Sequence, residues 1–195
     1  MSIALRPRLH AGLWLFCLCA PGAAIAAPPC AAGDTPAIEL RVVAAAIAPD
    51  ADRTTVVRVF DDGCVHVHRP AYRRDAGEFR VDLEPAALGA LRRQVDQSAL
   101  RTFDAKRIRA DLAATQGKRA TPEGAAQRYI ELDADQYELA WRSDGKRAAA
   151  AWPGLPAYAE AYPDNVPLQA FHNAAAALQA LADRGDAAAI DGGRP

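Results

Sequence analysis

Residues 61–70 read DDGCVHVHRP and place a thiol and two of the chain's four histidines on alternate positions. If this stretch is a β-strand, Cys64, His66 and His68 project from one face, because strand residues two apart share a face. Two imidazoles at that spacing can chelate copper or zinc. A zinc site usually has three or four protein ligands, and the only later histidine is His172. The pattern therefore favours outward-facing sheet residues for His66 and His68, with a metal site as the alternative.

Other catalytic patterns are missing from the sequence. Beyond residue 26 the chain has two serines, Ser98 and Ser143, and neither lies in a G-x-S-x-G turn. It has no glycine-rich phosphate loop, no H-E-x-x-H and no C-x-x-C. The acidic pair at 50–52 is typical of a turn, and the pair at 133–135 is typical of a kink or bulge between strands. The sequence therefore leans away from an enzyme and predicts no cofactor, with a site assembled from scattered residues as the alternative.

The first 26 residues have the layout of a secretory signal peptide. Arg6 and Arg8 precede a compact apolar run, 13–20, which is shorter than the roughly 20 residues that span a bilayer. Small residues at 24–26 then predict cleavage after Ala26. The mature protein is expected to be periplasmic or secreted, with no membrane span. Cleavage removes two arginines and no acid from a chain of net charge −1, so no basic excess remains to attract nucleic acid.

Two cysteines, Cys30 and Cys64, remain after that cleavage. In an oxidising compartment a lone pair most often forms a disulfide. Such a bridge would be worth about 3–4 kcal/mol on the chain-entropy model. It would also attach the Ala- and Pro-rich stretch 27–37, otherwise a flexible tail, to the body of the protein. The alternative is a free Cys64 that acts as a metal ligand or a reactive thiol.

Residues 38–184 are predicted to form a single α+β domain. Tight turns at Asp62–Gly63 and Asp144–Gly145 favour antiparallel hairpins. Strand-like segments occupy 38–48, 54–60, 65–69, 78–83, 129–132, 137–141 and 146–152. We expect an antiparallel sheet of about five to six strands built from these hairpins, with two to three helices packed on one face.

Helical periodicity follows Pro85 and recurs, less clearly, over 104–115. The last helix is expected to begin after a capping Asn165 and to run to about Arg184. Residues 185–195 are small and polar, and they are predicted to form a disordered tail.

The aromatic residues add two expectations. A two-residue turn at Asp62–Gly63 would set Phe60 opposite Val65, and the face that carries Phe60 is then the predicted core face. Trp141 and Trp152 are expected in the core, because they bury a large apolar area. Tyr158 and Tyr162 lie in the proline-rich stretch 153–163, which is predicted to be irregular. They either cover the core or form a binding surface, since tyrosine is enriched at interfaces.

Four runs together resemble a pattern in uncharacterised secreted proteobacterial proteins, over about residues 38–184. The runs are TTVVRVFDDGCVHVHRP, FRVDLEPAALGALRRQV, YELAWRSDGKRAAAAW and PLQAFHNAAAALQALAD. The resemblance implies a hairpin, a helix, a late hairpin and a C-terminal helix in an exported protein. Those proteins carry no assigned activity, so it implies no catalytic residue. The expected function is a non-enzymatic binding or interaction module with a protein or cell-envelope partner.

Overall fold

A computed structural model describes residues 28–30, 35–119 and 133–190. The predicted signal peptide and the predicted strand 129–132 lie outside the described residues. Within them the chain forms one antiparallel sheet and a layer of helices, so the predicted α+β class is confirmed.

The sheet has seven described strands, slightly more than the sequence predicts. Their order across the sheet is β6-β5-β1-β2-β3-β4-β7, and each neighbouring pair is antiparallel. The strands are β1 (Ile38–Val43), β2 (Thr54–Val59), β3 (Cys64–Arg69), β4 (Gly77–Asp82), β5 (Gln136–Ser143), β6 (Lys146–Pro153) and β7 (Ala188–Ala189). The first strand therefore lies near the middle of the sheet, between a three-strand meander and a late hairpin.

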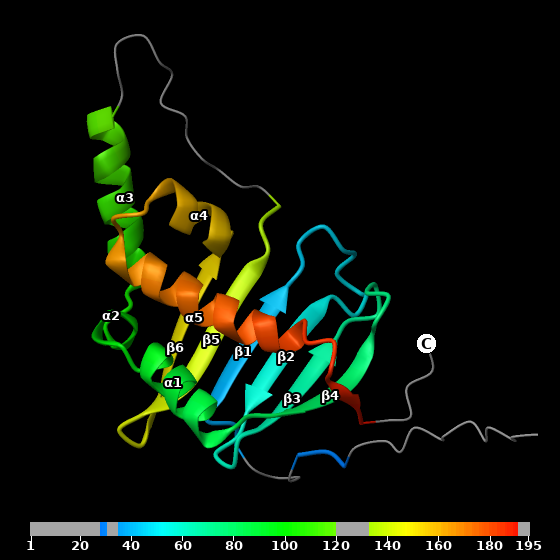
Figure 1. Ribbon diagram of the computed structural model, residues 1–195. Coiled ribbons are helices and arrows are strands. Elements are labelled where there is room, and N and C mark those ends of the chain that lie inside the picture. Colours follow the sequence, from blue (N-terminus) through cyan, green and yellow to red (C-terminus); the bar gives the residue numbers. More distant parts are fainter. Residues whose placement is uncertain (1–27, 31–34, 120–132, 191–195) are drawn as a thin grey trace, which may run out of the picture.

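The described helices are α1 (Pro85–Val95), α2 (Ser98–Arg101), α3 (Ala105–Arg119), α4 (Leu155–Ala161) and α5 (Val166–Ala182). Figure 1 shows α1, α4 and α5 lying across one face of the sheet. The longest, α5, contacts β2 and β3 as well as α1, α2 and α4, so it is the centre of the helical layer. Asn165 caps it as predicted, because its side chain accepts a hydrogen bond of 3.1 Å from the Leu168 amide.

Apolar side chains fill the space between the sheet and α5. The sheet residues that are at most 2% exposed here are Ile38, Leu40, Val57, Val59, Val65, Val67, Leu139, Trp141 and Trp152. From α5, Leu168, Phe171 and Leu178 are fully buried against them. Trp152 is also buried, which confirms that both tryptophans belong to the core. We call this side of the sheet the covered face.

The opposite side carries no described helix, and we call it the uncovered face (Figure 1). Its residues alternate with those of the covered face and are mainly charged or small: Glu39, Arg41, Arg58, His66, His68, Glu78, Arg80, Glu138, Ala140, Ala149 and Ala151. The sheet therefore has one face held by apolar burial and one by charged pairs.

The register of the β2–β3 hairpin differs from the prediction by one residue. The turn has three residues, because Phe60 pairs with Cys64 and Gly63 adopts a positive φ of 87°. Val65 consequently lies opposite Val59, and His66 opposite Arg58. Phe60 therefore falls on the uncovered face, and its predicted place in the main core is wrong. The histidines still face outward, as expected.

Two segments that were predicted to be irregular are ordered. In 153–163, Gly154 takes a left-handed conformation and a proline occupies the first turn, so α4 forms there. Ala188 and Ala189 pair with β4, and the Ile190 amide donates to Glu78, so the predicted disorder of 185–195 is wrong for these residues. Ala37, which was assigned to the tail, is buried and donates its amide to Val59.

Candidate ligand-binding pocket

Cys30 and Cys64 form the predicted disulfide, with their Cα atoms 5.8 Å apart. The bridge lies on the uncovered face, where Phe60 packs with the two half-cystines as a second, smaller apolar cluster. Arg80 donates a hydrogen bond of 3.1 Å to the Pro28 carbonyl, so the described part of the N-terminal segment lies against β4. The alternative of a free Cys64 ligand or nucleophile is therefore wrong.

His68 is held between two carboxylates on the uncovered face. Its Nδ1 lies 2.6 Å from Glu78 Oε1, and its Nε2 lies 3.1 Å from both oxygens of Asp52. Burial opposes protonation, but the hydrogen bonds to Asp52 and Glu78 outweigh it and raise the pKa of His68. Partial burial of Asp52 acts to raise the pKa of its carboxyl. The hydrogen bond to His68 outweighs this effect, so the pKa of Asp52 is lowered. The two carboxylates therefore favour the protonated form of the imidazole.

His66 shares the same acid, since its Nε2 lies 2.6 Å from Glu78 Oε2. That oxygen is buried and has no hydrogen bond of good angle, so the two groups lie in close contact without a directed bond. Within the described parts of the chain, no group of three or more His, Cys, Asp or Glu side chains is arranged to hold a metal ion. The structure thus brings His66 and His68 together but ties them to carboxylates, and the predicted metal site gains no third ligand there.

Tyr158 and Tyr162 also lie together, with ring centroids 6.2 Å apart. Tyr158 packs edge-to-face on Trp152 at 5.3 Å, and Tyr162 is buried. These contacts join them to the aromatic cluster of the core, which fits the expectation that they cover it. Of the two rings, Tyr158 keeps partial exposure and Tyr162 is buried, so Tyr158 offers most of the accessible aromatic surface of the pair, and a binding role for them stays a prediction.

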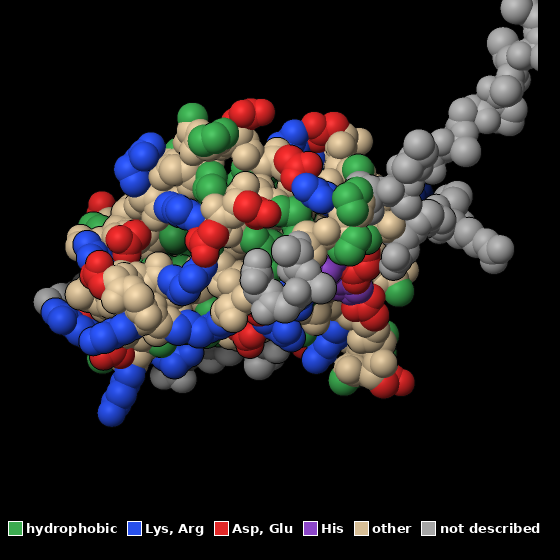
Figure 2. Space-filling model, turned by 90° about the horizontal axis from the view of Figure 1, so that it is seen from below, with side chains coloured by type: hydrophobic (Ala, Val, Ile, Leu, Met, Phe, Trp, Pro, Cys, Tyr) green, Lys and Arg blue, Asp and Glu red, His purple; other side chains and the backbone are tan. Residues whose placement is uncertain are grey.

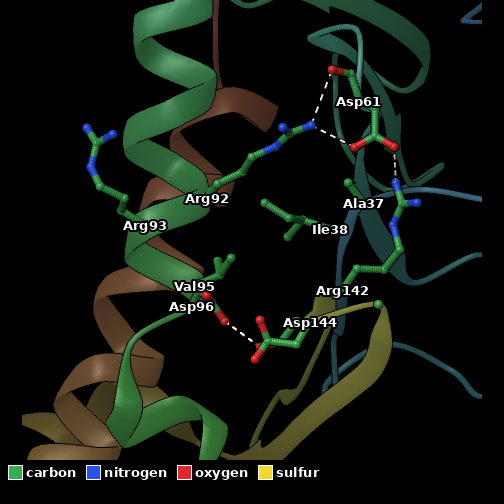
Figure 3. A pocket seen from close by; sticks show the side chains of 11 residues that line it. Ala37, Ile38, Asp61, Arg92, Arg93, Val95, Asp96, Arg142 and Asp144 are labelled. Atoms are coloured by element: carbon green, nitrogen blue, oxygen red, sulfur yellow. Dashed lines mark hydrogen bonds and ion pairs between the residues drawn. The ribbon is translucent and has the colours of Figure 1, made fainter.

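A pocket of about 410 Å³ opens at the end of the sheet that carries the hairpin turns. Four segments meet there: the start of β1, the β2–β3 turn, the second half of α1 and the β5–β6 turn (Figure 3). Its lining residues are Ala37, Ile38, Asp61, Arg92, Arg93, Val95, Asp96, Arg142, Ser143, Asp144 and Gly145. Figure 2 views this end of the molecule and shows basic and acidic side chains intermingled rather than a patch of one sign.

At one side of the pocket two guanidinium groups converge on a single carboxylate. Arg92 donates to Asp61 Oδ1 at 2.6 Å, and Arg142 donates to Asp61 Oδ2 (Figure 3). Arg92 also donates to the backbone carbonyl of Asp61 at 3.2 Å. This side of the pocket therefore carries two guanidinium groups against one carboxylate.

The other side of the pocket is acidic. Ser143 donates its hydroxyl to Asp96 Oδ1 at 2.6 Å, and Arg101 lies 3.8 Å from Asp96 and 3.6 Å from Asp144. The β5–β6 turn is the predicted two-residue type, with positive φ at Asp144 and Gly145. The described lining contains no histidine, cysteine or lysine. The partner of the Ser143 hydroxyl is the Asp96 carboxylate, and the lining presents charged groups of both signs.

The sequence analysis missed Asp61, Arg92 and Arg142, because these residues come from three segments that only the sheet topology brings together. The available indications were an Asp ahead of a predicted turn, an Arg pair late in a predicted helix, and an Arg just before the Asp-Gly turn. None of these is specific without knowing that β5 pairs with β1.

The fold and the bridge define a disulfide-bonded α+β protein with a two-sided antiparallel sheet. Among the described residues no helix is both long and apolar enough to cross a membrane. Comparison with known proteins finds no matching family model, no matching curated protein and no matching solved structure.

Proposed function

We propose that this protein is an exported, non-enzymatic binding module of the periplasm or the extracellular space. Its ligand is an anionic group, carried by a protein or a cell-envelope component, that enters the pocket between α1 and the hairpin turns. The predicted signal peptide and the Cys30–Cys64 disulfide support export, because disulfides persist in oxidising compartments.

The convergence of Arg92 and Arg142 on one carboxylate carries this proposal. A planar guanidinium matches the geometry of carboxylates and phosphates, and arginine is the usual residue where such groups are recognised. The pocket volume of about 410 Å³ lies within the range typical of small-molecule sites. The apolar Ile38 and Val95 between its charged sides would exclude water from part of a bound ligand (Figure 3).

The test uses the mature, oxidised protein and a set of small carboxylates, phosphates, amines and neutral sugars. Backbone amide chemical shifts report where each compound binds, and mass spectrometry reports whether it is recovered unchanged. We expect anions to shift residues 61–63, 92–96 and 142–145 and to be recovered intact. Shifts confined to residues 66–68, or no binding by any anion, would contradict the proposed pocket. A converted compound would contradict a non-enzymatic role.

A further inference from the structure

We infer that the pocket binds a carboxylate in the position that the Asp61 side chain now fills, so that Asp61 is an internal ligand which an external carboxylate displaces. This inference rests on the proposed function and specifies the chemistry of the ligand. Two observations carry the inference. The arrangement of Arg92 and Arg142 around Asp61 fits a carboxylate, and the hydrogen bonds that hold the β2–β3 turn do not involve the Asp61 side chain.

The two arginines are spaced for a carboxylate. Each oxygen of Asp61 receives its own guanidinium, Oδ1 from Arg92 and Oδ2 from Arg142. The two cations come from opposite walls of the pocket, and without an anion between them they would repel each other. A planar group with two oxygens therefore completes the site, whether it belongs to Asp61 or to a ligand.

Asp61 can leave this position without disturbing its own turn. Its side chain is 61% exposed. The turn is held by other bonds, in which the Gly63 amide donates to Phe60, the Cys64 amide donates to the side chain of Asp62, and the Leu83 amide donates to Gly63. Asp62, rather than Asp61, therefore stabilises the turn, and rotation of the Asp61 side chain costs no backbone hydrogen bond of the turn.

Arg92 has a second contact that remains when the carboxylate leaves. It keeps its hydrogen bond to the Asp61 backbone carbonyl. The backbone of Arg142 is fixed by its strand, since its amide donates to the Ala37 carbonyl at 2.9 Å, and its guanidinium is released with the carboxylate. The Arg93 side chain points away from Asp61 (Figure 3). One of the two guanidinium groups is therefore preorganised for an incoming anion, which limits the entropy lost on binding.

The other lining residues indicate which chemical group is attached to the carboxylate of the ligand. Ala37, Ile38 and Val95 form an apolar wall beside the two guanidinium groups (Figure 3). A carboxylate attached to a short apolar group fits this wall, and the C-terminal residue of a peptide has that chemistry. Because Asp61 is tethered at high effective concentration, it competes with such a ligand and weakens its binding.

The experiment measures binding of N-acetylleucine and of its uncharged analogue N-acetylleucinamide to the full mature protein by calorimetry and amide shifts. We compare the wild type with Asp61→Asn, and with Asp62→Asn, which removes the same charge from the same turn. Asp61→Asn should bind N-acetylleucine at least about tenfold more tightly than the wild type. Asp62→Asn should not, and Arg142→Gln added to Asp61→Asn should abolish the gain. Circular dichroism and melting temperature check that each variant is folded.

Three results would overturn the inference: equal affinities for the Asp61 and Asp62 variants, equal binding of the acid and the amide, or equally tight binding of inorganic phosphate. A further arm compares N-acetylleucine with a tetrapeptide that ends in a free leucine. Tighter binding of the peptide supports a chain end as the ligand, and equal binding supports a free small acid. If inorganic phosphate shifts the pocket residues while carboxylates do not, the carboxylate inference fails and the proposed anion-binding function stands.

Discussion

Alternate residues of β3 lie in two different environments. Val65 and Val67 point to the covered face and are 0% exposed, whereas His66 and His68 point to the uncovered face with side chains 27% and 26% exposed. The valines are held by apolar burial, which has no direction and does not change with pH near neutrality. The histidines are held by Asp52 and Glu78, and the contribution of His68 depends on its protonation, because its pKa is raised. One strand therefore combines a pH-independent source of stability with a titratable one.

The comparison also separates stability from binding. The uncovered face holds the residue types that first suggest chemistry, but their donors are already paired with carboxylates. The pocket lies at the end of the sheet, where residues of β1 and β5 and two turns meet α1. Four variants, one of them a double substitution, test whether the covered face is held by apolar burial and the uncovered face by the disulfide and charged pairs.

The largest effect is expected for Val67→Asp. A carboxylate in the packed core has no partner there, and a buried unpaired charge is among the few changes that cost more than about 4 kcal/mol. We expect the variant to be largely unfolded in circular dichroism and urea titration. The control is His66→Gln on the other face, which should lose less than about 1 kcal/mol. Similar losses for the two variants would contradict the assignment of faces.

The next largest effect is expected for loss of the disulfide. Cys30 and Cys64 are separated by 34 residues, and opening such a loop costs about 3–4 kcal/mol on the chain-entropy model. Cys30→Ser with Cys64→Ser should therefore lower the free energy of unfolding by about that amount, as should reduction of the wild type. A loss below about 1 kcal/mol would show that the bridge does not constrain the unfolded chain as this model requires.

Arg69→Met should have an intermediate effect. Arg69 is the only buried charged residue in the described ranges, and it donates to the carbonyls of Ala182 and Arg184 at 2.8 Å each. It also pairs with Asp75 at 2.9 Å, so methionine leaves several polar groups without a partner. We expect a loss of about 2–3 kcal/mol and faster amide exchange at the end of α5. Arg73→Met, at a more exposed position nearby, should cost less than about 1 kcal/mol.

The smallest effect is expected for His68→Gln, and it should appear in the pH profile. The raised pKa of His68 means that the folded state binds the proton more tightly than the unfolded state does. Its contribution is therefore complete below the unfolded pKa of about 6.5 and is lost as pH rises through the folded pKa. The lowered pKa of Asp52 acts in the opposite sense, and its contribution is lost as pH falls through the folded value.

Wild-type stability, measured by urea titration at a series of pH values, should therefore decline above about pH 6.5 more steeply than that of His68→Gln. The difference should stay below about 1 kcal/mol, as for other partly exposed ion pairs. Asp52→Asn should reduce the same slope. Parallel profiles for all three proteins would rule out the cluster as a source of pH dependence.

Local patterns in the sequence were sufficient for most elements. The β-branched run before Asp62–Gly63, the stripe of α1 and the cap at Asn165 each predict their element within a few residues. The one-residue error in the β2–β3 hairpin arose because an Asp-Gly pair suits both a two-residue turn and the end of a three-residue one. The sequence letters are the same in both cases, and only the backbone hydrogen bonds distinguish them.

The pocket could not be predicted for a different reason. It depends on the pairing of β1 with β5, and three strands and three helices of the described residues lie between these two strands along the chain. No local pattern encodes that pairing. The disulfide was predictable because only two cysteines remain after the predicted signal peptide, so that there was one possible partner.

The central position of β1 also bears on the order in which the protein folds. As the chain is synthesised, β2, β3 and β4 follow β1 closely and can pair in sequence, but β5 arrives only after α1, α2 and α3. Until then one edge of β1 presents unpaired amide and carbonyl groups, and such edges template contacts with other chains. The charged Glu39 and Arg41 on that strand oppose such contacts. Docking of the late β5–β6 hairpin therefore closes an open edge of the nascent sheet, and its rate should influence the refolding yield at high protein concentration.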